Sequence, residues 1–315
     1  MAKNSVQFQK GLSDIEFMGQ YGTEEKCIEH LLKAKWPNGF CCPDCGGIKG
    51  CYLSSRKVFQ CNACHKQTSL IAGTIFQGTK LPLLRWFIAM HHLSSNKHGI
   101  SSIELSRKMG VSVNTALTVK HKIQQVMLER NSKNVLSGRV EIDDAYIGGE
   151  HVGGKRGRGS ENKTPFVAAV STTAKGEPHQ VKLNVIIGFK KQHIKKWAIS
   201  HLAKKTTVVS DGLHCFSAVE SAGCEHDRVV VGAGNKSTNL SCFNWVNTIL
   251  GNIKTSLAGT YHSISKKHIP RYLAEFQYRF NRRYDLKALI PRLLYVAAAT
   301  PPMPKRLLSM AETHW

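Results

Sequence analysis

The 315-residue sequence predicts a multidomain α/β protein, and three observations support this fold class. Seven of the ten cysteines fall before residue 65, so the N-terminal part has a composition of its own. Apolar residues then recur at helical spacing as far as about residue 130, and strand-like segments begin at residue 139. Compact units of roughly 100–200 residues fit this length. We therefore expect domains over residues 1–80, 81–134 and 135–315.

The charge of the chain points to a polyanionic partner. There are 44 Lys and Arg residues against 21 Asp and Glu, which gives a formal net charge of +23. Such an excess is most simply explained by binding to nucleic acid, although a basic enzyme with an unrelated substrate is the alternative. A hydrophobic content of 42% excludes global disorder. Neither a membrane span nor a secretory signal is recognisable, so we expect a cytoplasmic protein that is associated with the nucleoid.

The N-terminal cysteines have the spacing of a metal site. Cys42 and Cys45 form one C-x2-C pair, Cys61 and Cys64 form a second, and fifteen residues separate the pairs. Each pair makes a tight turn that directs two thiolates to one point, and two such turns complete a tetrahedron around Zn²⁺. The adjacent Cys41 is a less well spaced competitor. The sequence therefore predicts a zinc ribbon with a structural Zn²⁺ ion, preceded by a helix.

Two helices around a glycine follow the ribbon. A short helix ends at Gly110, Ser112 is a plausible N-cap, and a second helix is expected over Val113–Met127. This pattern is typical of a helix-turn-helix, in which basic residues of the second helix, here Lys120 and Lys122, contact DNA. A plain helical connector is the alternative.

The region after residue 138 predicts a mixed sheet with flanking helices. Strands are expected at Arg139–Ile147, Phe166–Thr172, Val181–Ile187 and Thr206–Ser210, with a helix at His193–Lys204 between the last two. Within this sheet, Asp143 lies in the first strand and Asp211 ends the fourth. Paired carboxylates at such positions can hold two Mg²⁺ or Mn²⁺ ions for phosphodiester chemistry. Solvated, turn-capping aspartates are the alternative, and strand alternation alone allows Asp144 in place of Asp143.

Five motifs together resemble a known family. They are CPDCG at 42–46, FQCNACHKQTSLIAGTIF at 59–76, VEIDDAYIGG at 140–149, VVSDG at 208–212, and the segment from NWVN to FNRR at 244–283. This combination resembles the DDE-type bacterial insertion-sequence transposases that have an N-terminal zinc ribbon. The resemblance implies a ribonuclease H-like catalytic domain that binds terminal inverted repeats and catalyses metal-dependent strand cleavage and strand transfer. It also implies double-stranded DNA as partner and a homodimer or larger assembly on DNA.

The same resemblance assigns the residues of the catalytic triad. The two aspartates of the family match Asp143 and Asp211, and Asp144 stands where relatives usually have Glu. The third position falls on Asn247, and the basic residue that often accompanies the triad falls on Lys254. Asn is a neutral ligand, so this site has one negative charge fewer than a three-carboxylate site. A catalytically inactive, domesticated copy that acts only as a DNA-binding protein is therefore the alternative function.

Basic segments lie on both sides of the predicted site in the sequence. Residues 151–205 and residues 236–306 each contain twelve Lys or Arg and two acidic residues. Charge runs of this kind suit a channel that holds DNA by its phosphates, although a single run is often only a solvated face. The residues that we expect to contact DNA here are Lys155, Arg156, Arg158, Arg279, Arg282 and Arg283.

Overall fold

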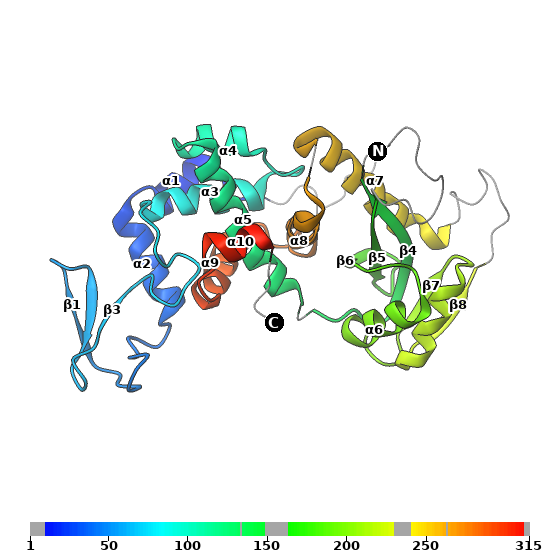
Figure 1. The fold of residues 1–315 in the computed structure, drawn as a ribbon, viewed down its shortest axis with the longest axis horizontal. Helices are drawn as coiled ribbons and strands as arrows, with labels where there is room; N and C mark the ends of the chain where they lie inside the picture. Colours follow the sequence, from blue (N-terminus) through cyan, green and yellow to red (C-terminus); the bar gives the residue numbers. More distant parts are fainter. Residues whose placement is uncertain (1–9, 133, 149–162, 230–240, 263, 312–315) are drawn as a thin grey trace. The chain divides into compact units, whose positions relative to one another are not determined.

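The computed structural model describes residues 10–132, 134–148, 163–229, 241–262 and 264–311. The chain divides into two compact units, one made of residues 1–130 together with 282–315 and the other of residues 131–281 (Figure 1). This division differs from the predicted boundaries, which stay a prediction. The C-terminal segment belongs to the N-terminal unit and does not extend the sheet domain, and residues 1–80 and 81–134 share one unit.

The first unit begins with two short helices and a small antiparallel sheet. The helices are α1 (Asp14–Tyr21) and α2 (Glu24–Lys35), and the strands are β1 (Gly50–Leu53), β2 (Val58–Cys61) and β3 (Gln67–Ser69), in the order β1-β2-β3. Both helices have side-chain N-caps, at Ser13 and at Thr23. The chain leaves α2 through Trp36, which packs against Phe40 and Phe59 of the ribbon. This aromatic cluster is the small core that the ribbon has besides its cysteines.

Three further helices and the C-terminal pair complete this unit. They are α3 (Leu83–Ser95), α4 (Ser102–Met109), α5 (Val113–Ser132), α9 (Leu289–Ala299) and α10 (Lys305–Met310). Gly110 ends α4 in the left-handed conformation at φ +62, and Ser112 Oγ accepts the Thr115 N–H, as predicted for the turn. Helix α9 packs against α2 and α3 because one of its faces is apolar and buried at Leu293 and Leu294. That interaction places residues 282–315 in this unit.

The second unit is built on a five-stranded mixed sheet. Its strands are β4 (Arg139–Ile147), β5 (Thr164–Thr172), β6 (Pro178–Val185), β7 (Thr207–Ser210) and β8 (Glu225–Arg228), in the order β6-β5-β4-β7-β8. Strands β4, β5 and β6 pair antiparallel, whereas β7 and β8 run parallel to β4. The four predicted strands are confirmed, and β8 is an additional polar edge strand.

Helices cover both faces of this sheet (Figure 1). They are α6 (Lys191–His201), α7 (Asn244–Ser256) and α8 (Ile269–Asn281), with 3-10 turns at His214–Ala222, Ser241–Phe243 and Lys266–His268 and a π-helical turn at Leu257–Tyr261. Val140 and Ile142 face α6, whereas Ala145 faces α7. Alternation along β4 therefore directs Glu141 and Asp143 to the α7 side. Strands and helices in this arrangement are those of a ribonuclease H-like domain.

None of the helices among the described residues combines the length and the apolar character that crossing a bilayer requires.

Candidate functional sites

The four predicted cysteines converge on one point in the ribbon. The Sγ atoms of Cys42 and Cys64 are 3.6 Å apart, as are those of Cys45 and Cys61, and all four lie within 4.8 Å of one another. A tetrahedron with Zn–S bonds of about 2.3 Å has edges of about 3.8 Å, so the donor set fits Zn²⁺. The neighbouring Cys41 is outside this group.

The two cysteine turns repeat the same backbone hydrogen bonds. In the first turn, the Cys42 N–H donates to the Gly47 carbonyl and the Gly46 N–H to the Cys42 carbonyl. In the second turn, the Cys61 N–H donates to Lys66 and the His65 N–H to Cys61. Gly46 and His65 hold the left-handed conformation at equivalent positions, with φ of +72 and +57. The repeat explains why the two C-x2-C pairs present their thiols symmetrically.

Backbone N–H groups favour the thiolate form at one cysteine of each pair. The Cys64 and Ala63 N–H groups lower the pKa of the Cys61 thiol to about 7. The N–H groups of Cys45 and Asp44 likewise lower the pKa of Cys42. Zinc binds thiolates, so these donors prepare the site for the metal.

Three carboxylates form a second cluster, at the sheet of the other unit. One oxygen from each of Asp143, Asp144 and Asp211 lies within 4.8 Å of the other two. Strand β4 pairs parallel with β7 in a register that places Ile142 beside Ser210. The next residue of each strand is an aspartate, so the register brings Asp143 and Asp211 together at the ends of the paired segment. All three residues are half-buried.

Asp143 and Asp144 both have a carboxylate oxygen in this group, so the choice between them stays a prediction. The Asp144 N–H donates to the Asp143 carboxylate at 2.8 Å, which links the two adjacent residues. Asp211 is held by the turn that follows it, where its carboxylate accepts the Leu213 N–H at 3.1 Å. Carboxylate oxygens in such a group are the ligands that Mg²⁺ and Mn²⁺ prefer.

The helix that carries the remaining predicted residues packs on the face of the sheet to which β4 directs Asp143. Helix α7 lies against β4 and β5, with Val246, Ile249 and Ile253 buried in the shared core. Asn247 and Lys254 are two helical turns apart, so both lie along one border of the buried stripe. Asn247 is half-buried and Lys254 is exposed. This placement leaves the Lys254 ammonium in solvent on the side of the helix that Asn247 occupies.

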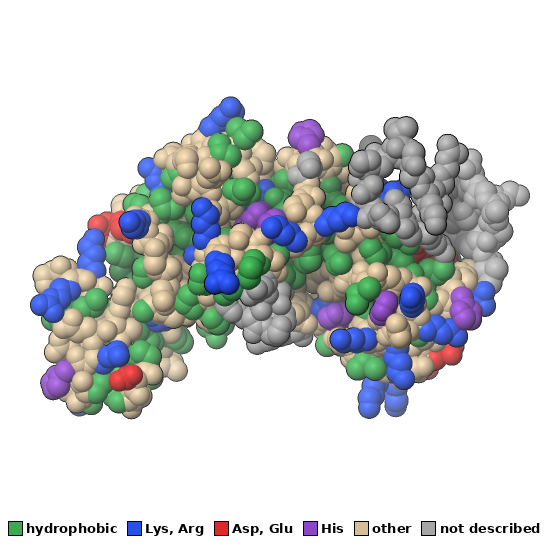
Figure 2. All heavy atoms as spheres, in the orientation of Figure 1, with side chains coloured by type: hydrophobic (Ala, Val, Ile, Leu, Met, Phe, Trp, Pro, Cys, Tyr) green, Lys and Arg blue, Asp and Glu red, His purple; other side chains and the backbone are tan. Residues whose placement is uncertain are grey.

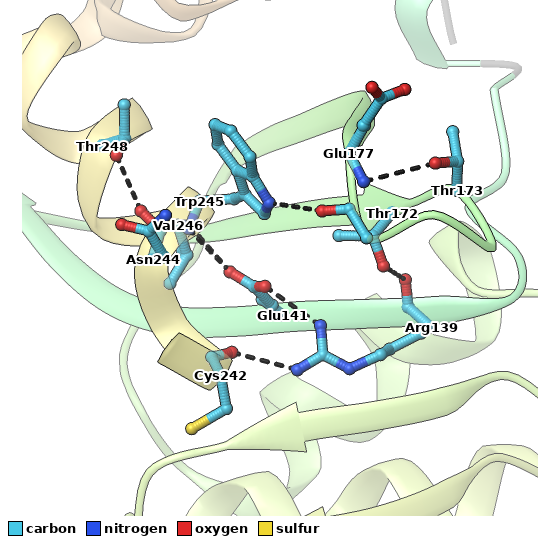
Figure 3. A network of polar contacts seen from close by, with 11 residues as sticks. Arg139, Glu141, Thr172, Thr173, Glu177, Cys242, Asn244, Trp245, Val246 and Thr248 are labelled. Atoms are coloured by element: carbon cyan, nitrogen blue, oxygen red, sulfur yellow. Dashed lines mark hydrogen bonds and ion pairs between the residues drawn. The ribbon is translucent and has the colours of Figure 1, made fainter. Parts of the chain in front are cut away.

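Sequence reasoning missed the residue that attaches α7 to the sheet. Glu141 is 1% exposed and its carboxylate accepts the N–H groups of Trp245 and Val246, both at 3.0 Å (Figure 3). Arg139 forms an ion pair with the other carboxylate oxygen at 3.0 Å. An acidic residue between apolar residues of a predicted buried strand, in VEID, is the signal that could have identified it.

A third group of potential ligands, Asp14, His91 and His92, lies in the first unit. The Asp14 carboxylate already bonds the His91 ring at 2.8 Å, and the ring of Phe17 stacks on His91. Burial lowers the pKa of His92. This contact joins α1 to α3 and accounts for the group as part of the packing.

The structure corrects the prediction that Lys120 contacts DNA. Its side chain is 0% exposed, and its ammonium donates to the Ile100 carbonyl at 2.7 Å within the helical core. Lys122 is also turned inward: its ammonium lies 5.9 Å from the Trp86 ring centre, and burial lowers its pKa. Residues 119–127 are all buried or half-buried, so this part of α5 presents no exposed face to DNA. Arg107, Lys108 and Asn114 are exposed around the turn instead.

The other predicted DNA contacts have mixed outcomes. Lys155, Arg156 and Arg158 lie outside the described residues. The side chain of Arg279 is 10% exposed and forms an ion pair with the buried Glu275, so its position is fixed by the core. Arg282 and Arg283 are half-buried. Figure 2 shows Lys and Arg side chains spread over the visible face of both units, with few acidic ones.

Known protein families match the two regions of the chain that contain the cysteine cluster and the carboxylate cluster. Residues 22–67 match the family model of a transposase zinc-ribbon domain, and residues 135–281 match that of an ISXO2-like transposase domain. The second match ends where the second compact unit ends. The chain is also 25% identical over 280 residues to an uncharacterized protein in transposable element ISH50 of Halobacterium salinarum, which covers 82% of this chain and 90% of that protein.

Proposed function

Because the chain belongs to the ISXO2-like transposases, we propose that it cleaves and joins DNA strands at the ends of its own insertion sequence. The observation that carries this proposal is the convergence of Asp143, Asp144 and Asp211 where the parallel pairing of β4 and β7 ends. A group of carboxylates suits divalent metals that also bind DNA phosphate.

Each residue of the site has a distinct role in the proposed reaction. Asp143, Asp144 and Asp211 would hold Mg²⁺ or Mn²⁺, and the Asn247 amide oxygen would be a neutral further ligand. When bound, two such ions activate the attacking oxygen and stabilise the leaving oxygen of an in-line displacement. The exposed ammonium of Lys254 would bind a phosphate of the strand being cut.

The reaction consists of two displacements at phosphorus. Water first attacks the phosphodiester at each element end, and the bond to the 3′ oxygen breaks with proton transfer to that oxygen. The freed 3′-hydroxyl then attacks a phosphodiester of the target DNA. The 3′ oxygen of the target strand leaves and takes up a proton. No protein nucleophile is needed in either step. Because two element ends react together, we expect a homodimer or a larger assembly on DNA.

The first unit would provide the recognition of DNA. The ribbon with its structural Zn²⁺ and the helix-turn-helix of α4 and α5 would bind the terminal inverted repeats. Since Lys120 and Lys122 point inward, the exposed Arg107, Lys108 and Asn114 around the turn are better placed for this contact. Phosphate contacts from such residues would make the binding strongly salt-dependent.

The test is an assay of cleavage and joining on the element's own ends with Mg²⁺ or Mn²⁺. Wild-type protein is expected to give metal-dependent 3′ nicks and joined products, and Asp211→Ala is expected to give neither while still binding DNA. Nicks without joined products would indicate a nuclease.

A second candidate function follows from the neutral Asn247. If wild-type protein is silent and Asn247→Glu restores cleavage, the chain is a catalytically inactive relative that acts as a zinc-ribbon DNA-binding protein. DNA binding by wild type would then be the remaining activity to measure.

A further inference from the structure

We propose that Glu141 is a positioning residue, which fixes the first turn of α7 and thereby sets Asn247 against the carboxylate cluster. This inference rests on the proposed function, since it concerns the same metal site. The contacts of Glu141 with α7 and with Arg139 assign it this role. The Arg139 guanidinium acts with it as the partner of its charge.

The carboxylate of Glu141 forms a cap on the N-terminus of α7 that comes from a different element (Figure 3). One oxygen accepts the N–H groups of both Trp245 and Val246, at 3.0 Å each. These groups belong to the first turn of the helix, where N–H groups have no partner within the helix. The residue at the N-cap position, Phe243, offers no side-chain acceptor of its own. Glu141 therefore replaces a local cap by a tertiary one.

The charge of Glu141 is compensated on both sides. The positive end of the helix dipole faces one oxygen, and the guanidinium of Arg139 lies 3.0 Å from the other. Arg139 also donates to the Cys242 carbonyl at 3.2 Å, in the turn just before α7. Glu141 is 1% exposed, so loss of these partners would leave a buried charge unpaired. This arrangement explains why a carboxylate is tolerated within the sheet.

The cap lies one or two residues away from the proposed metal ligands on both β4 and α7. Asp143 follows Glu141 by two residues and points to the same face of β4. Asn247 directly follows Val246, whose N–H the cap holds. A shift of the first turn of α7 along β4 would therefore move Asn247 relative to Asp143. The cap thus fixes the distance between a neutral ligand and a charged one.

Other contacts keep α7 in place without Glu141, so a substitution there is expected to leave the unit folded. The Trp245 indole N–H donates to the Gly176 carbonyl at 2.7 Å. The apolar side of the helix stays buried at Val246, Ile249 and Ile253. The expected effect is a loosened first turn and not an unfolded domain.

The experiment is a double-mutant cycle on Mn²⁺ binding by the full-length protein, followed by the loss of the free Mn²⁺ signal in electron paramagnetic resonance. Glu141→Ala is expected to raise the Mn²⁺ dissociation constant about tenfold, as for other residues that orient metal ligands. In the Asn247→Ala background the same substitution is expected to have no further effect. Glu141→Gln keeps an oxygen acceptor for both N–H groups and is expected to recover part of the loss.

A matched control comes from the first unit. Glu24 caps α3 in the same manner, with its carboxylate oxygens accepting the N–H groups of Leu83 and Leu84 at 2.8 and 3.0 Å. Glu24→Ala is expected to lower the melting temperature without changing Mn²⁺ binding. If Glu141 had a purely structural role, Glu141→Ala would likewise lower the melting temperature without changing Mn²⁺ binding.

Two outcomes would overturn the proposal. One is an effect of Glu141→Ala that remains in full in the Asn247→Ala background, and the other is wild-type protein that binds no Mn²⁺. If Mn²⁺ binding shows the expected coupling but no DNA strand is cut, the positioning role stands and the proposed function fails. If Glu141→Ala does not fold, Glu141→Gln takes its place in the cycle. Its effect on the Mn²⁺ dissociation constant must then also disappear in the Asn247→Ala background.

Discussion

The two ligand clusters of this chain are assembled in opposite ways. The ribbon collects four thiols from residues 42–64, and the peptide groups of two short turns orient them. The carboxylate cluster brings the adjacent Asp143 and Asp144 together with Asp211, which lies 67 positions beyond Asp144, through the pairing of two parallel strands. The first site depends on local geometry, whereas the second exists only when the sheet has formed.

The sources of stability differ in the same way. The ribbon strand β1 is mostly exposed, and Cys45 and Cys64 lie at the surface, so little apolar area is buried around the thiols. The sheet of the second unit is covered on both faces by buried apolar clusters. We infer that the metal holds the ribbon together, whereas the hydrophobic core holds the carboxylate site together.

The largest effect that tests this comparison is removal of zinc. A strong chelator is expected to unfold residues 42–69 and leave the second unit intact, because binding of structural Zn²⁺ contributes about 10–16 kcal/mol in small zinc domains. Amide hydrogen exchange would measure this as loss of protection in β2 and β3 with unchanged protection in β4 and β5. Cys61→Ser should have the same effect.

Cys51 provides the control for that experiment, because it is exposed on β1 and outside the cluster. Cys51→Ser is expected to bind Zn²⁺ as wild type does. Protection that survives chelation in β2 would mean that the aromatic contacts of Trp36 suffice to fold the ribbon.

The next largest effect concerns the carboxylate cluster. Asp143→Ala and Asp211→Ala are each expected to lower the rate of strand cleavage about 10³-fold or more, since bound metal supplies several kcal/mol of transition-state stabilisation. The melting temperature should not fall, because these half-buried carboxylates repel one another without metal. Rates of DNA nicking and thermal melts would measure the two effects.

Asp227 is the matched control, as an exposed aspartate on the edge strand β8. Asp227→Ala should cleave at the wild-type rate. Asp144→Ala sharpens the result: a loss as large as that of Asp143→Ala would show that both adjacent carboxylates bind metal.

The sequence predicted the local site fully and the distant one in part. Cysteine spacing identified all four thiols because a C-x2-C turn determines its own geometry. The strand that contains Asp143 and the strand that Asp211 follows were also predicted, since β-branched and aromatic residues mark such segments. That the two carboxylates meet follows from the parallel register of β4 and β7, which no local pattern encodes.

Two predictions differ from the arrangement in the structure, and both differences have a common physical origin. Lys120 was assigned to DNA by its charge, but its ammonium is buried against the Ile100 carbonyl. Likewise the C-terminal helices were assigned to the sheet unit by their position, although α9 packs on α2 and α3. Both depend on tertiary packing between distant segments, which overrides charge and chain order.

A smaller effect, the loss of stability at acid pH, tests whether the second unit depends on its buried core. His201 ends α6, its Nδ1 is buried without a hydrogen-bond partner among the described residues, and burial together with the charge of Lys182 lowers its pKa to about 4. Because the folded pKa is below the ordinary value of about 6.5, its contribution to stability is present above pH 6.5 and is lost as pH falls toward 4.

Lowering the pH from 7 to 5 should therefore reduce the stability of the second unit by about 2 kcal/mol through this group. Urea unfolding followed by hydrogen exchange of β5 would measure it. His201→Phe keeps a ring for the contact with Trp197 and should remove that part of the loss. An equal loss in the variant would assign the acid sensitivity to other groups.

The smallest expected effect is a gain of charge at the distant site. Asn247→Asp replaces a neutral amide by a carboxylate of the same shape, so Mn²⁺ binding should strengthen about tenfold, which corresponds to about 1.4 kcal/mol. Asn252 lies on the exposed side of the same helix, away from Asn247, and Asn252→Asp is the control for general electrostatic attraction. Tighter binding in both variants would show only that an acidic helix attracts cations. Tighter binding in Asn247→Asp alone would place this residue beside the metal and would show that the cluster, unlike the ribbon, is completed by a helix more than thirty residues beyond its last carboxylate.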